Sequence, residues 1–180
     1  MRFLSYISIM AKNLDHLGIK SVVDTYDLFF IDLWGVVHNG INLYDYSIEV
    51  LDNLAAAKKE FVLLTNAPRP NATVINFLKK IGLKRYFKNV FTSGEAAQKY
   101  LFNELKKKKF FHIGPVKDHD LFKNIEKNKV LNIEDSDYLL CTGLFENHEN
   151  NLNYYKNLFS NQISKKMICT NPDLIVDRGE

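Results

Sequence analysis

A chain of 180 residues with 46% hydrophobic residues is long enough for one large or two small globular domains with packed cores. Its 24 basic and 21 acidic residues leave a net charge of only +3, which argues against nucleic acid as a partner. No apolar run approaches the roughly 18 residues of a membrane helix, so we also expect no membrane partner.

Two cysteines, Cys141 and Cys169, each lie inside an apolar run, YLLCTG and KMICTN. We favour inert thiols in the core over a disulfide, which fits a reducing cytoplasm. The N-terminal stretch MRFLSYISIM leads into the following residues without a small-residue cleavage site. We therefore predict no signal peptide and a cytoplasmic protein.

Short apolar runs rich in β-formers alternate with helical patterns along the chain. The continuous run LFFIDLW predicts a strand at residues 28–34 that is covered on both faces. A helical pattern follows at 47–60, and FVLLTN predicts a second buried strand at 61–66. Together these three segments predict a βαβ unit.

The same alternation continues to the other end of the chain. Asn71 is the predicted N-cap of a helix over 71–82, which Gly82 ends. A strand is predicted at 89–94 and a helix at 95–109. The pattern then repeats in FFHIG, DHDLFKNIEKN, DYLLCTG, NNLNYYKNLFSNQ and KMICTNPD. The sequence therefore predicts an α/β fold with a parallel sheet.

Polar residues stand at the ends of four of these strands: Asp32, Thr65-Asn66, Thr92-Ser93-Gly94 and Thr170-Asn171. In parallel α/β folds, the carboxyl ends of the strands and the nearby helix N-termini gather ligands. Each group taken alone has a simpler interpretation, because Asp, Asn, Ser and Thr also cap helices and make turns. Their coincidence at four strand ends predicts a functional site.

Four motifs occur in a fixed order: DLWGVVHNG, FVLLTNAPRP, VFTSGEAA and ICTNPD. A buried strand that ends in D-x-x-G-V-x-x-x-G, followed by one that ends in T-N, resembles motifs I and II of the haloacid dehalogenase (HAD) superfamily. The full set resembles its class IIA, which includes NagD-like sugar phosphatases, 4-nitrophenylphosphatases and pyridoxal phosphatases. The resemblance covers residues 14–180 and implies a Rossmann-like core with an α/β cap of the C2 type.

The resemblance implies a phosphoric monoester phosphatase that works through an aspartyl-phosphate intermediate. Asp32 would be the nucleophile, while Thr65 and the backbone amide of Asn66 would hold the phosphoryl oxygens. Mg²⁺ would bind Asp32 and the backbone carbonyl of Trp34. The implied partner is a small phosphorylated metabolite, such as a sugar phosphate. Dimerisation through cap surfaces in the family also implies a homodimer.

The resemblance further implies a division of the chain. Residues 1–94 would form the first part of the HAD core, and residues 95–180 would form a nearly complete cap. Thr170, Asn171 and Asp173 would belong to a substrate loop of the cap that faces the catalytic pocket. A strand that ends in a proline turn is the simpler interpretation of this loop.

Trp34 departs from the pattern of most superfamily phosphatases. They carry a second Asp there, which protonates the leaving alcohol and then activates water, a contribution of roughly 10² to 10⁴ in rate. The D-x-W-G motif resembles a distinct branch of class IIA. His38 is a weak candidate for a substitute acid. Gly35 and Gly40 would permit the tight turn and the hairpin flap that follow motif I.

The family places a Lys of motif III and the acidic motif IV after the cap, and neither precedes Glu180. We therefore expect an incomplete phosphatase with an exposed apolar sheet edge. Arg69 is either a phosphate or cap contact, or an exposed charge in a loop. Two functions stay open: a Mg²⁺-dependent phosphohydrolase, and a non-catalytic phosphate binder or inactive fragment of a longer phosphatase.

Overall fold

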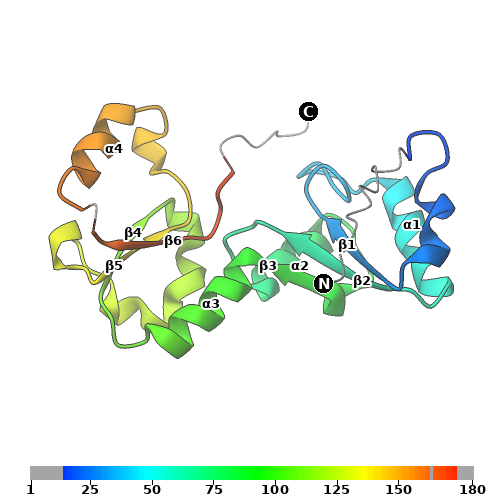
Figure 1. Cartoon of the computed structure of the whole chain (residues 1–180), viewed down its shortest axis with the longest axis horizontal. Helices are drawn as coiled ribbons and strands as arrows, with labels where there is room; N and C mark the ends of the chain where they lie inside the picture. The colour runs from blue at the N-terminus through cyan, green and yellow to red at the C-terminus, as the bar shows by residue number, and fades with distance from the viewer. Residues whose placement is uncertain (1–13, 163, 174–180) are drawn as a thin grey trace, which may run out of the picture.

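The computed structural model describes residues 14–162 and 164–173, and two three-stranded parallel sheets organise them. The first sheet has the order β1 (Leu28–Asp32), β2 (Glu60–Thr65), β3 (Val90–Thr92). The second has the order β4 (Phe110–Ile113), β5 (Tyr138–Cys141), β6 (Lys166–Cys169). Figure 1 shows the sheets towards opposite ends of the molecule, with α3 (Ser93–Glu104) between them. The predicted α/β fold class is confirmed.

Helices and short 3₁₀ segments connect the strands. The other α-helices are α1 (Asp45–Ala56), α2 (Asn71–Lys80) and α4 (Leu152–Phe159). The 3₁₀ segments are η1 (Ile19–Ser21), η2 (Val23–Thr25), η3 (Phe87–Asn89), η4 (Val116–Asn128), η5 (Ile133–Asp135) and η6 (Glu146–His148). None of the helices in the described ranges is both long and apolar enough to cross a membrane.

The core of the first half forms where α1 and α2 pack against the sheet. Leu51 and Leu54 of α1, Val74 and Leu78 of α2, and Leu63 of β2 are buried in one cluster. The helical residues recur at intervals of three or four, which places them on one face. Because each such side chain contributes about 1.5 to 3 kcal/mol when fully buried, this cluster fixes the helices on the sheet.

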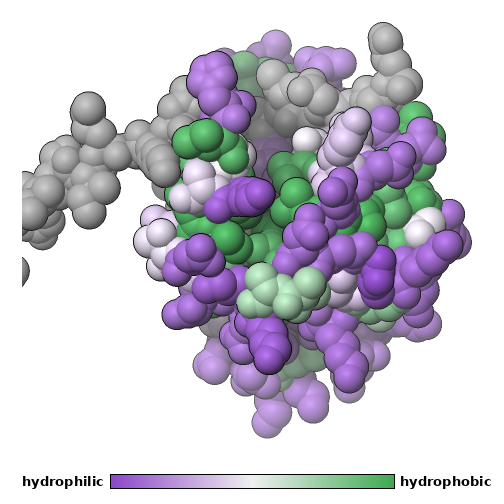
Figure 2. All heavy atoms as spheres, turned by 90° about the vertical axis from the view of Figure 1, so that its right-hand side faces the viewer, coloured by the Kyte–Doolittle hydropathy of each residue, from purple (hydrophilic) through white to green (hydrophobic). Residues whose placement is uncertain are grey.

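β1 lies at the edge of its sheet and is not covered on both faces. It pairs only with β2 among the described residues, and 44% of Leu28 and 68% of Phe30 are exposed. The predicted coverage of both faces is wrong, because Leu28 and Phe30 alternate with Phe29 and Ile31 and point to a face of the sheet that stays exposed. Apolar residues are exposed here, but on a face of the sheet: a hollow of about 900 Å³ includes both residues and Leu64 of the central strand β2. Figure 2 shows apolar atoms between polar side chains at this end of the molecule.

Two helix starts differ from the sequence prediction. Pro70 occupies the cap position of α2, and Asn71 is the first helical residue. The Oδ1 atom of Asn71 instead accepts a hydrogen bond from the backbone N–H of Thr92 at 3.0 Å. α3 begins at Ser93, because the Thr92 hydroxyl oxygen caps it by accepting from the N–H of Glu95 at 2.8 Å. The third strand is therefore shorter than predicted, and α3 starts earlier.

The helix predicted at 118–128 is a series of 3₁₀ turns, η4. Phe122 and Ile125 interrupt it with φ values of −121° and −124°. These two side chains and Leu121 are 0 to 2% exposed and pack with Phe110 and Tyr138 of the second sheet. The 3₁₀ turns place these three apolar side chains in the core of the second half of the chain.

Candidate active site

Asp32 stands at the carboxyl end of the first sheet. It is the last residue of β1 and is exposed. Its Oδ1 atom accepts a hydrogen bond from the backbone N–H of Leu33 at 2.7 Å. Leu33 and Val37 are at most 1% exposed, so they anchor the chain where it leaves the strand. The backbone thus positions a carboxylate that solvent and ligands can reach.

A small hairpin flap follows Asp32. Gly35 and Gly40 have φ values of +74° and +91°, which only glycine adopts without strain. His38 forms isolated β-bridges with Trp34 and Leu43, which close the hairpin. A Cβ atom at Gly40 would lie 2.6 Å from the Trp34 ring, so the indole and the glycine pack directly together. The predicted turn and flap are confirmed.

His38 is buried in the flap, with 3% of its surface exposed. Its Nδ1 atom accepts a hydrogen bond from the N–H of Gly40 at 3.0 Å, which assigns the proton of the neutral ring to Nε2. Burial lowers the pKa of His38, although the Asp32 carboxylate acts in the opposite direction. Its ring meets those of Trp34 and Phe77 edge-on, with centroids 5.4 Å apart. A neutral, buried imidazole is a poor proton donor, so the structure favours a packing role for His38.

Thr65 ends β2 at the same sheet edge as Asp32. Asp32 pairs in register with Leu64, so Thr65 lies one residue beyond that pair. Neighbouring strands are about 4.8 Å apart, which brings the two strand ends side by side. The Thr65 hydroxyl oxygen accepts a hydrogen bond from the N–H of Ala67 at 3.2 Å, which shapes the loop that begins at Asn66. The structure thus brings Asp32, Thr65 and Asn66 to one edge.

The segment 170–173 after β6 contacts this edge from the other half of the chain. The Nδ2 atom of Asn66 donates to Oδ1 of Asp173 at 3.1 Å. The hydroxyl of Ser93, the first residue of α3, lies 2.6 Å from the carbonyl oxygen of Thr170 and 2.8 Å from that of Asn66. Ser93 therefore sits at the junction of the two segments.

The three predicted loop residues differ in their surroundings. Thr170 is 3% exposed, and its hydroxyl donates to the carbonyl of Cys141 at 3.2 Å, so its side chain supports the second sheet. Oδ1 of Asn171 accepts from the N–H of Asp173 at 3.0 Å and forms a local turn. Asp173 is exposed and reaches Asn66. Their role as a substrate loop stays a prediction.

Arg69 also contacts the other half of the chain. Its Nε atom donates to Oδ1 of Asp118 at 3.0 Å, and Asp118 is 2% exposed. Burial raises the pKa of Asp118, while the Arg69 guanidinium acts to lower it. The hydroxyl of Thr73 donates to Asp120 nearby. The contact with the predicted cap is the correct alternative for Arg69, and the interpretation as an exposed loop charge is wrong.

The donor set fits a magnesium ion only in part. In the part of the chain that the structure describes, no group of three or more His, Cys, Asp or Glu could hold a metal ion. Mg²⁺ nevertheless binds proteins through one or two carboxylates and completes its shell with waters and substrate phosphates. Asp32, followed closely by the carbonyl of Trp34, matches that kind of site.

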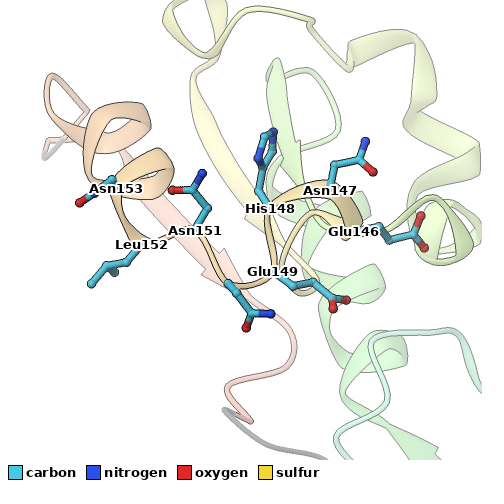
Figure 3. A pocket seen from close by; sticks show the side chains of 8 residues that line it. Glu146, Asn147, His148, Glu149, Asn151, Leu152 and Asn153 are labelled. Carbon is cyan, nitrogen blue, oxygen red and sulfur yellow. The ribbon is translucent and has the colours of Figure 1, made fainter.

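A hollow of about 590 Å³ elsewhere is lined by residues 146–153 (Figure 3). All its lining residues belong to one continuous segment, and two of its polar side chains serve the local fold. Oδ1 of Asn151 caps α4 by accepting from the N–H of Tyr154 at 3.0 Å, and the His148 ring stacks on Tyr154 with centroids 3.7 Å apart. Because it gathers no residue from the strand ends, we assign no site to this hollow.

A family model for haloacid dehalogenase-like hydrolases matches residues 29–127, a stretch that includes Asp32 and Thr65. The chain belongs to this family. It is thus a member of a hydrolase family, as the motifs predicted. No curated protein sequence matches the chain significantly.

Solved structures of the family resemble the whole described fold. A HAD-like hydrolase from Brucella suis 1330 is 28% identical, with a TM-score of 0.78 over 95% of this chain and 64% of that one. A 4-nitrophenylphosphatase from Thermotoga maritima is 23% identical, with a TM-score of 0.64 over 88% of this chain and 62% of that one. NagD from E. coli K-12 is 18% identical, with a TM-score of 0.57 over 85% and 61%.

The family match confirms the resemblance to the HAD superfamily, and the three solved structures share the fold of this chain. The chain spans less than two thirds of the length of each of the three.

Proposed function

We propose that the protein is a phosphohydrolase that acts on a small phosphorylated metabolite, such as a sugar phosphate. The observation that carries this proposal is the exposed Asp32 carboxylate beside Thr65, each at the carboxyl end of its strand. Ligands of parallel α/β folds bind at that edge. The family match over residues 29–127, which contains both residues, supports the same reaction class.

In the proposed reaction, an oxygen of Asp32 attacks the phosphorus atom, and the bond from phosphorus to the ester oxygen breaks. The Thr65 hydroxyl and the backbone amide of Asn66 hold the phosphoryl oxygens as charge develops on them. Because the Trp34 indole is no acid, the leaving alcohol takes its proton from water. Water then hydrolyses the aspartyl-phosphate and releases inorganic phosphate.

Asp32 and the backbone carbonyl of Trp34 would hold Mg²⁺ in this scheme. When bound, such an ion offsets phosphoryl charge as a Lewis acid. Residues 1–94 would supply the first part of the core and residues 95–180 the cap, with a homodimer formed through cap surfaces. The two separate sheets and the contact between Asn66 and Asp173 support this division.

A second candidate function is binding of a phosphate ligand without turnover. Trp34 favours it, because an indole packed against Gly40 and His38 replaces the group that assists the leaving alcohol in most relatives. In this case Asp32 and Thr65 would keep the pocket while the rate falls.

The test measures the hydrolysis of 4-nitrophenyl phosphate in the presence of Mg²⁺ by the parent chain and by its Asp32→Asn variant. The same pair is also assayed in any longer product of the same gene. Asp27→Asn is the matched control, because Asp27 is a fully exposed carboxylate near the start of β1. In whichever form turns over the ester, we expect Asp32→Asn to abolish turnover and the control to retain it. If the Asp32→Asn variant still hydrolyses the ester, Asp32 is not the nucleophile. Binding of inorganic phosphate without turnover would support the second function.

A further inference from the structure

Cys141 and Cys169 lie side by side at the ends of β5 and β6. They are register partners in the parallel pair, so their side chains point to the same face of the sheet. Neighbouring strands are about 4.8 Å apart, and disulfides join residues whose Cα atoms are about 4.4 to 6.8 Å apart. The spacing of the two strands thus lies within the range of Cα separations that disulfides span.

Neither cysteine is fully buried in the core. Both cysteines are free, Cys169 is exposed and Cys141 is partly buried. The interpretation of both as inert core thiols is therefore wrong for Cys169. Burial, together with the neighbouring Cys169 thiol, raises the pKa of Cys141 to about 11. Because Cys169 is the more exposed of the two, a reagent from solvent reaches its sulfur first.

The thiols also organise the loops that follow their strands. The Cys141 thiol donates to the carbonyl oxygen of Gly143 at 3.5 Å, and the Cys169 thiol donates to that of Asn171 at 3.3 Å. A disulfide contains no thiol hydrogen, so its formation removes both hydrogen bonds. Asn171 belongs to the segment 170–173, so a change at the sulfur atoms acts directly on the start of this segment.

That segment connects the dithiol to the candidate active site. The N–H of Thr170 donates to the carbonyl of Cys141 at 2.9 Å, and the carbonyl of Thr170 accepts from Ser93. Three residues later, Asp173 accepts from Asn66 in the loop that follows Thr65. A short run of hydrogen bonds thus leads from the two sulfur atoms to the end of β2.

We propose that Cys141 and Cys169 form a dithiol site that a peroxide oxidises to an intramolecular disulfide, which alters the segment 170–173. The Cys169 thiolate attacks one peroxide oxygen, the O–O bond breaks, and a sulfenic acid and one water form once a proton is taken up. The Cys141 sulfur then attacks the Cys169 sulfur and displaces a second water as its own proton is transferred. Two thiols are oxidised to one disulfide while hydrogen peroxide is reduced to two waters.

Formation of the disulfide is independent of phosphatase activity, whereas its consequence for substrate binding rests on the proposed function. The experiment therefore uses chemical readouts. The reduced full chain is treated with hydrogen peroxide, and its thiols are counted and its mass measured. We expect the two thiols to disappear, the mass to fall by that of two hydrogen atoms, and a peptide that joins residues 141 and 169 to form. Dithiothreitol should reverse all three changes.

Two matched variants separate the steps. Cys141→Ser should stop the reaction at a Cys169 sulfenic acid, which dimedone traps. Cys169→Ser should leave Cys141 largely unmodified over the same time. The proposed site would be overturned if the oxidised chain formed disulfide-linked dimers instead of the internal bridge. It would also be overturned if both thiols stayed reduced under conditions that oxidise free cysteine.

A second measurement tests the effect on the segment. Amide hydrogen exchange should rise several-fold at residues 142, 143, 171 and 173 in the oxidised chain, because the hydrogen bonds from both thiols are lost. A cross-linked chain with unchanged exchange in these two segments would overturn the proposed connection between the dithiol and the segment 170–173.

Discussion

Replacing Arg69 with Met removes the partner of a buried carboxylate. Asp118 is 2% exposed, and the Nε atom of Arg69 lies 3.0 Å from its Oδ1 atom. Breaking a buried ion pair from one side costs about 3 to 5 kcal/mol. The Arg69 side chain is itself 31% exposed, so water reaches the carboxylate once the guanidinium is gone. We therefore expect Arg69→Met to lower the free energy of unfolding by about 2 to 3 kcal/mol at pH 7.

This loss should be smaller in acid. Burial raises the pKa of Asp118 and Arg69 opposes that rise, so Arg69→Met raises the pKa of Asp118 further. A carboxyl group with a folded-state pKa above its unfolded value lowers stability as the pH rises between the two values. Below the unfolded value the group is protonated in both states and this penalty disappears. The variant should therefore lose more stability at pH 7 than at pH 4.

The measurement is urea unfolding, followed by circular dichroism, at both pH values. Arg85→Met is the matched control, because Arg85 pairs with Asp52 at 2.5 Å while their side chains are 60% and 33% exposed. An exposed pair contributes at most about 1 kcal/mol, so the control should lose little at either pH. Equal losses in the two variants, or a loss from Arg69→Met that does not change with pH, would refute the reasoning.

Three further substitutions have separate readouts. Gly94→Ala should lower the thermal unfolding temperature, because its Cβ atom would lie 2.3 Å from the backbone nitrogen of Arg69; an unchanged temperature would contradict that close approach. Phe30→Lys should change stability by no more than about 0.5 kcal/mol, since 68% of Phe30 is exposed, yet reduce self-association in sedimentation. Unchanged association would show that the exposed apolar face at β1 is not the contact. Trp34→Asp should raise the hydrolysis of an alkyl phosphate more than that of 4-nitrophenyl phosphate.

Periodicity predicted the elements well wherever an apolar face determines them. α1 and α2 bury residues at helical spacing, so both were visible in the sequence. The predicted ends of helices and strands were wrong where a contact with a residue distant in the sequence determines them. Asn71 is a good cap residue by type, but its side chain binds the backbone of Thr92 on the neighbouring strand. Phe30 fits a buried strand by its apolar character, yet its side chain points to a face of the sheet that stays exposed.

The sequence predicted the strand ends of the site because parallel pairing alone brings Asp32 and Thr65 to one edge. It gave no sign of Asp118, whose surrounding pattern DHDLFKNIEKN looks like an ordinary exposed helix with acidic residues at its start. Its burial arises from tertiary packing against the loop of Arg69. The burial of His38 also comes from tertiary packing, because aromatic rings on two sides enclose it.

The effect of Trp34→Asp is best measured as the ratio of two hydrolysis rates, that of an alkyl phosphate and that of 4-nitrophenyl phosphate. A single rate would mislead, because Trp34 also packs within the flap. Its ring occupies the space that a Cβ atom of Gly40 would enter, and it meets the His38 ring edge-on. Loss of the indole exposes His38 and loosens the chain beside Asp32, which lowers the rates for both esters alike. A new acid at position 34 assists only the alcohol that leaves poorly, because 4-nitrophenolate needs no proton. The ratio of alkyl to aryl phosphate hydrolysis within the variant therefore isolates the acid, and a ratio equal to that of the parent chain would show that residue 34 does not reach the leaving oxygen.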